Sequence, residues 1–140
     1  MADSADLDDA IVAILVNDAT LAGLLPDGVW IGAAKPGAVR YGLILLPATA
    51  DLAMFTGRAF EEVTYTVLAV VCSTTGSTGK AAAARIDALL QGAQPVVAGF
   101  APAVVQRTRR HRRPDRDADD PSIRWDVRGG DYTLTAAALP

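Results

Sequence analysis

The sequence contains one cysteine, Cys72, and one histidine, His111. A single cysteine excludes an intramolecular disulfide. One cysteine and one histidine are also too few to form a zinc site built from these residue types. Long hydrophobic runs are also missing, because every apolar stretch is short and interrupted, so we expect no membrane span. The chain begins with aspartates rather than the basic segment of a signal peptide, and we therefore expect a soluble protein made in a cytoplasm.

Net charge is also small, at −3, which excludes the strong overall positive charge typical of nucleic-acid-binding proteins. The charges are nevertheless unevenly placed: aspartates gather near the N-terminus and arginines near the other end. The arginine-rich segment contains Arg107, Arg109, Arg110, Arg112, Arg113 and Arg116. This asymmetry predicts two surfaces directed at different neighbours. The length of 140 residues suits one domain over 1–140 with a substantial core.

Periodicity predicts the order of helices and strands. Apolar residues recur every third or fourth position in three segments, as on one buried face of a helix. In other segments apolar residues alternate with polar ones or follow one another without interruption, which is typical of strands. We expect Pro47 to end the second strand, a loop over 51–58 and a turn over 129–131. Helices are predicted at 4–17, 19–25 and 78–91, and strands at 29–31, 41–46, 61–72, 104–113, 122–128 and 132–135.

This order has no regular strand–helix alternation, so we expect an α+β fold with a mostly antiparallel sheet and helices packed on one face. Residues at about 104–128 form a charged C-terminal hairpin. Neither face of its first strand carries an apolar stripe, so the hairpin must project into solvent or onto a partner. Alternation places Val105, Arg107, Arg109 and His111 on one face, and Gln106, Thr108, Arg110 and Arg112 on the other.

Three patterns resemble sites of chemistry, and each is incomplete. The segment 76–80 lies where a phosphate-binding loop would lie, but Ala81 lacks the hydroxyl that would bind magnesium. His111 lies among arginines with no carboxylate nearby in sequence to orient it, so we expect a solvated position. Glu61 and Glu62 point to opposite faces of a strand and cannot share a site. We expect no catalytic residue, no metal and no cofactor.

The arginine-rich segment remains open to three interpretations: a solvated ribbon, a phosphate contact or a protein interface. Sequence-specific nucleic-acid binding is disfavoured because Trp125 is the one aromatic residue nearby. The adjoining link is acidic, and this mixture of charges favours a self-complementary interface. The candidate interface or DNA-channel residues are the six arginines together with Arg58, Asp117, Asp119 and Asp120.

Several segments together have a familiar layout. They are a leading amphipathic helix ending in Asn17-Asp18-Ala19-Thr20-Leu21, the turn Leu24-Leu25-Pro26-Asp27-Gly28-Val29-Trp30, the strand Tyr41-Gly42-Leu43-Ile44-Leu45, Gly57-Arg58 before the strand at 63–70, a helix at 81–90, and the closing segments at 123–128 and 132–135. Over nearly its whole length the chain thereby resembles the tail terminator (tail-completion) proteins of long-tailed bacteriophages.

The resemblance implies a non-enzymatic virion protein that forms a hexameric ring. Such a ring ends the tail tube and joins it to the connector of the head. The implied partners are other copies of the chain, the major tail tube protein and the neck proteins, and DNA passes through the channel without sequence-specific binding. Two alternatives remain: a neck adaptor or head-closure protein, and a small non-specific nucleic-acid-binding module.

Overall fold

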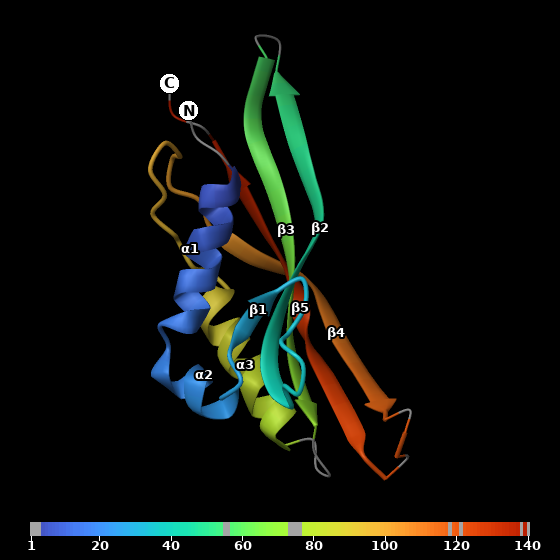
Figure 1. Ribbon diagram of the computed structural model, residues 1–140. Coiled ribbons are helices and arrows are strands. Elements are labelled where there is room, and N and C mark those ends of the chain that lie inside the picture. The colour runs from blue at the N-terminus through green and yellow to red at the C-terminus, as the bar shows by residue number, and fades with distance from the viewer. Residues whose placement is uncertain are drawn as a thin grey trace.

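A computed structural model describes residues 4–54, 57–72, 77–117, 119–120, 122–137 and 139; the side chains at 4, 47–54 and 57–61 are not described. Five strands form one sheet in the order β1-β2-β3-β5-β4, in which β1 pairs with β2 in parallel and the other pairs are antiparallel. The predicted α+β fold is therefore confirmed (Figure 1). The elements are α1 (Ser4–Val16), α2 (Ala19–Leu24), β1 (Val29–Ile31), β2 (Arg40–Met54), β3 (Gly57–Cys72), α3 (Ser77–Leu90), β4 (Val105–Arg116) and β5 (Arg124–Ala136).

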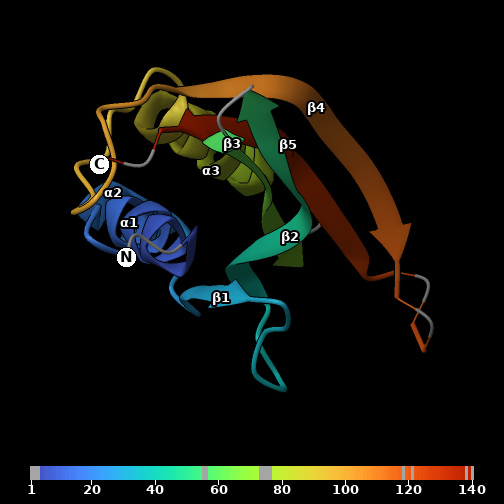
Figure 2. The same cartoon turned by 90° about the horizontal axis from the view of Figure 1, so that it is seen from above.

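The helices lie on one side of this twisted sheet (Figure 2). The alternating residues of β3 supply the sheet's half of the core, because every second side chain faces the helices. The i, i+4 residues of α1 and α3 supply the other half. The buried residues that meet there include Leu7, Ile11, Leu15, Val63, Tyr65, Val67, Ala69, Val71, Ala82, Ile86 and Leu90.

Two buried tyrosines of the sheet form hydrogen bonds to helices α1 and α3. The hydroxyl of Tyr65 on β3 donates to Oδ1 of Asp8 on α1 at 2.7 Å, and that of Tyr132 on β5 donates to Oδ1 of Asp87 on α3 at 2.9 Å. Burial, followed by the hydrogen bond to the neighbouring carboxylate, raises the pKa of each phenol above its ordinary value. Both phenols therefore remain protonated donors at physiological pH.

Two sequence predictions about where strands end are wrong. Strand β2 continues past Pro47, and residues 51–54 and 57–58 are paired in the β2–β3 ladder instead of forming a loop. A register shift between Leu45 and Ala48 explains this, since a proline is tolerated where a strand bulges. The paired ends of β2 and β3 extend well beyond the helices (Figure 1).

The turn predicted at 129–131 is also absent, because β5 runs unbroken through both glycines. A Cβ on Gly129 would collide with the carbonyl oxygen of Val67 on β3, and one on Gly130 would come within 2.7 Å of the carbonyl oxygen of Arg109 on β4. These glycines therefore allow close approach of the neighbouring strands. The hairpin consequently joins the sheet as its edge, with its closed end extending away from the helices (Figure 1).

Candidate assembly surfaces

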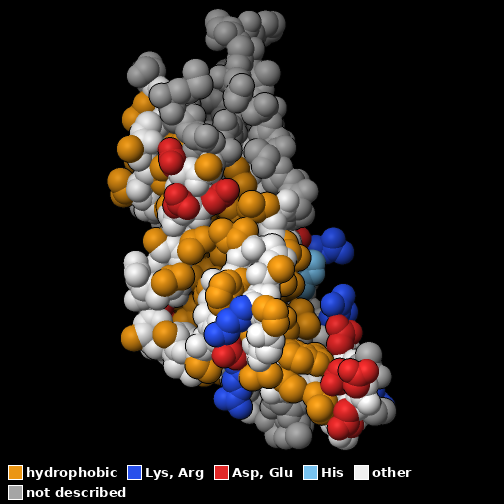
Figure 3. All heavy atoms as spheres, in the orientation of Figure 1, with side chains coloured by type: hydrophobic (Ala, Val, Ile, Leu, Met, Phe, Trp, Pro, Cys, Tyr) orange, Lys and Arg blue, Asp and Glu red, His pale blue; other side chains and the backbone are white. Residues whose placement is uncertain are grey.

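Strand β4 is an edge strand, and it carries most of the candidate residues. Arginine side chains and the single histidine gather along this edge, and acidic side chains gather at its outer end (Figure 3). From Gln106 onward every β4 side chain is exposed or half-exposed. A charged edge of this kind discourages uncontrolled pairing with other strands, although it remains available to a partner of opposite charge.

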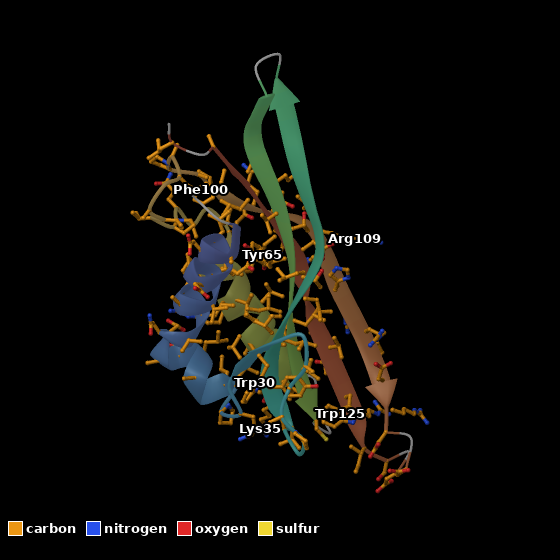
Figure 4. All side chains as sticks on the ribbon, turned by 45° about the horizontal axis from the view of Figure 1, so that its top comes forward. Trp30, Lys35, Tyr65, Phe100, Arg109 and Trp125 are labelled. Carbon is orange, nitrogen blue, oxygen red and sulfur yellow. The ribbon has the colours of Figure 1, made fainter. Side chains whose placement is uncertain are left out.

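A bulge decides which way these charges point. The pairing of β4 with β5 shifts between Arg107 and Arg109, which leaves Thr108 as an extra residue. The extra residue reverses the alternation of side chains. Arg107 thus faces α3, whereas Arg109 points away from the helices (Figure 4). The prediction that Arg107, Arg109 and His111 share one face is wrong, because alternation assumes an unbroken ladder.

On the helix side, β4 and α3 enclose a cleft of about 490 Å³. Among the described residues, five cationic side chains line it, and we call it the basic cleft. Asp87 is the one acidic residue in this described lining. The cations come from three separate elements, which the fold brings together. They are Lys80 of α3, Arg107, Arg110 and Arg112 of β4, and Arg128 of β5.

Two of these cations are already paired within the chain. Nη1 of Arg107 lies 3.1 Å from Oδ1 of Asp87, and Nε of Arg128 lies 2.8 Å from Oδ2 of Asp126. Within the described portion of the chain, no carboxylate forms a salt bridge with the other three, which are exposed. Lys80, Arg110 and Arg112 therefore leave the basic cleft with an excess of positive charge.

The sheet face opposite the helices bears a second surface, which we call the open apolar face. Its upper part is polar, with Thr64 and Thr66, and its lower part is apolar. The lower part forms a depression of about 460 Å³, bordered by charged residues near the end of β4. Its apolar residues are Tyr41, Leu43, Leu45, Leu68, Val70, Trp125 and Val127. Strand β2 is an internal strand of the sheet, and one face of its apolar run is uncovered by the described residues.

The end of β4 and the link that follows it form a third surface, the acidic link, made of Asp115, Asp117, Asp119 and Asp120. Nε of Arg113 lies 3.0 Å from Oδ2 of Asp115, so this pair is satisfied locally. Asp120 accepts from the hydroxyl and the backbone N–H of Ser122, and these bonds hold its pKa below the usual range. Asp117 and Asp119 have no salt bridge to any residue that the structure describes.

His111 has a carboxylate neighbour, contrary to the expectation from sequence. Its Nε2 lies 2.8 Å from Oδ1 of Asp131, which also accepts from the hydroxyl of Thr66 at 2.6 Å. Burial alone would raise the pKa of Asp131, but the bonds from Thr66 and His111 outweigh it and lower the pKa. The contact depends on the bulge in β4. It links β3, β5 and β4 by hydrogen bonds on the open side of the sheet.

The structure therefore divides the predicted arginine cluster between two sides of the sheet. Sequence reasoning missed Lys80 and Arg128, which complete the basic cleft, and no local pattern identifies them. The side chain of Arg58 lies outside the described residues. Among the described residues, no three His, Cys, Asp or Glu side chains are grouped to hold a metal ion. No described helix is both long enough and apolar enough to cross a membrane.

These features define a small α+β protein with a sheet covered on one side and with separate basic, acidic and apolar surfaces. The whole fold is similar to that of a solved chain from the "virion of native gene transfer agent (GTA) particle", at 23% identity and a TM-score of 0.70, over 97% of this chain and 98% of that one. A second solved chain, whose name describes no function, matches at 17% identity and a TM-score of 0.68, over 100% and 99%. No family model matches, and no curated protein matches.

Proposed function

We propose that this chain is a structural subunit of a phage-like virion, and that it is a tail terminator. The observation that carries the proposal is the whole-chain similarity of fold to a chain of the gene transfer agent virion, with nearly all of both chains covered. The coverage supports a comparable subunit rather than a shared fragment. In this function the protein is not an enzyme, and it acts by contact with other virion proteins.

The surfaces support assembly in particular. An apolar depression bordered by charges is typical of a protein interface. A cyclic ring with more than two subunits needs two different complementary surfaces on each subunit, and this chain has several. We propose a homohexamer that ends the tail tube and joins it to the connector, with DNA passing through the channel without sequence-specific contacts.

The experiment is to purify the protein and to measure its mass by light scattering, followed by negative-stain microscopy. Rings of six subunits are expected, together with binding to a major tail tube protein. A protein that stays monomeric at all concentrations and does not assemble with the tube protein contradicts the proposal. Copurification with portal-side proteins instead of tube protein would identify a neck adaptor or head-closure subunit.

The basic cleft also raises a nucleic-acid-binding function as a second candidate. That function requires binding to arbitrary duplex DNA that weakens steeply as salt rises, because counterions are released from the phosphates. It also requires a smaller salt dependence for each arginine removed. Absence of binding at low salt would exclude it.

A further inference from the structure

The basic cleft has more positive charge than its own chain neutralises. Three of its five cations lack a salt bridge among the described residues, and two of these, Arg110 and Arg112, are exposed on the edge strand. Arginine at such a position presents a planar fork that binds carboxylates or phosphates in two-point contacts. The cleft is therefore suited to an anionic partner.

A carboxylate partner fits this cleft better than a nucleic acid. Non-specific binding of single strands uses aromatic faces on which bases stack. The aromatic residue in the lining, Tyr132, is only 1% exposed and its hydroxyl is bonded to Asp87. The chain as a whole is also acidic, with a net charge of −3, which opposes attraction to a polyanion.

The chain itself provides a matching acidic group. Asp117 and Asp119 of the acidic link are half-exposed and exposed, and neither forms a salt bridge within the described part of the chain. The paired strands keep this link away from its own cleft, since the ladder continues to Arg116 and Arg124. Asp117 lies seven positions after Arg110 and five after Arg112, which at about 3.3 Å per residue corresponds to roughly 23 Å and 17 Å along the strand. The acidic link can therefore fill only the cleft of another copy.

We propose that the acidic link of one subunit binds in the basic cleft of the next subunit around the ring. This inference rests on the proposed function, because a ring is what repeats the contact. Link and cleft are different surfaces, so the contact can repeat head-to-tail from one subunit to the next, and it forms a ring where the rotation between neighbours closes. Arg110 and Arg112 bind carboxylates of Asp117 and Asp119, with Lys80 adding positive charge.

The test reverses the charge on each side separately. R110E/R112E gives a cleft that repels the acidic link, and D117K/D119K gives a link that repels the basic cleft. Asp120 is left unchanged because it stabilises the turn by its hydrogen bonds to Ser122. Each variant alone is expected to need at least a tenfold higher protein concentration than the wild type to assemble, as measured by light scattering over a range of concentrations. An equimolar mixture is expected to recover assembly, because every contact in an alternating ring then joins opposite charges.

Controls carry charge reversals of the same kind elsewhere on the chain. R109E alters the residue next to Arg110, which points to the other side of the sheet, and D6K/D9K alters acidic residues of α1. Both controls are expected to assemble at a protein concentration within about twofold of that needed by the wild type. Recovery in the mixture also shows that both reversed variants fold.

The outcomes separate the two proposals. A wild-type protein that forms no ring contradicts the proposed function. This inference alone is overturned if R110E/R112E forms rings as well as the wild type does. It is also overturned if the mixture does not recover assembly although circular dichroism shows that both variants are folded. Binding of a 20-base-pair duplex at low salt that R110E/R112E abolishes, with the ring intact, would assign the cleft to DNA and overturn it as well.

Discussion

At the scale of single residues, the glycines of β5 show how tightly the sheet is packed at its centre. Gly129 lies against the backbone of Val67 and Leu68 on β3, where there is no flexible side chain to move aside. Gly23, by contrast, is exposed on α2 and has nothing within 4 Å of the position of a Cβ. The same substitution should therefore have opposite effects at these two positions.

We expect G129A to lower the free energy of unfolding by about 3 kcal/mol or more, because the backbone of β3 must shift to admit the methyl group. We expect G23A to raise it by about 0.5–1 kcal/mol, since alanine restricts the unfolded chain and favours helix. Urea unfolding followed by tryptophan fluorescence measures both. A G129A protein as stable as the wild type would contradict the close packing of β3 and β5.

At the scale of elements, Asp18 joins two helices. Its Oδ2 accepts from the backbone N–H of Leu21 at 2.8 Å and so caps α2, while Nε and Nη2 of Arg85 on α3 donate to its two oxygens at 2.9 and 2.6 Å. The hydrogen bond from Arg85, followed by that from Leu21, lowers the pKa of Asp18 to about 2 from 3.8. One carboxylate therefore both begins α2 and holds it against α3.

The lowered pKa predicts the pH range in which this contact matters. Its stabilisation is fully present above about pH 4 and is lost as the pH falls towards 2, because the folded protein then has to accept the proton. D18N keeps a capping side chain but loses the charge, so its Tm should be roughly 2–4 °C below that of the wild type at pH 7. This gap should shrink between pH 4 and pH 2.

Differential scanning calorimetry across this pH range measures the gap. D9N is the control, since Asp9 is an exposed carboxylate on α1, and its Tm at pH 7 should match that of the wild type. A gap between D18N and the wild type that stays constant down to pH 2 would show that Arg85 does not hold the charged form of Asp18.

At the scale of the whole molecule, the asymmetry of the sheet is the main finding. One face is covered by three helices, whereas the lower half of the other face presents apolar side chains from β2, β3 and β5. The described core lies between the helices and the covered face, and the residues that line the open apolar depression do not belong to it. The composition of the open apolar face is instead suited to contact with another protein.

We expect L43D to abolish ring formation while leaving the fold intact, because a carboxylate in the open apolar face would be buried without a partner on assembly. V96D is the control, since Val96 is 97% exposed in a loop, and it should assemble like the wild type. Light scattering reports assembly, and circular dichroism reports folding. Rings formed normally by L43D would show that this face is not an interface.

The sequence by itself determined the parts of this protein that depend on local periodicity. The spacing of Leu7, Ile11 and Leu15 and the alternation from Val63 to Val71 correctly predicted α1 and β3, and with them the α+β class. These patterns succeed because helix and strand have fixed periods of 3.6 and 2, and the core requires one apolar face of each.

Only the tertiary structure decided where strands shift and which distant charges meet. Pro47 and Gly129 resemble strand breakers, yet a bulge accommodates the first and a closely packed neighbour requires the second. One extra residue, Thr108, sends Arg107 and Arg109 to opposite sides, and the packing of α3 then adds Lys80 to the cleft. Register and packing depend on pairing partners far away in sequence, so no local pattern contains them.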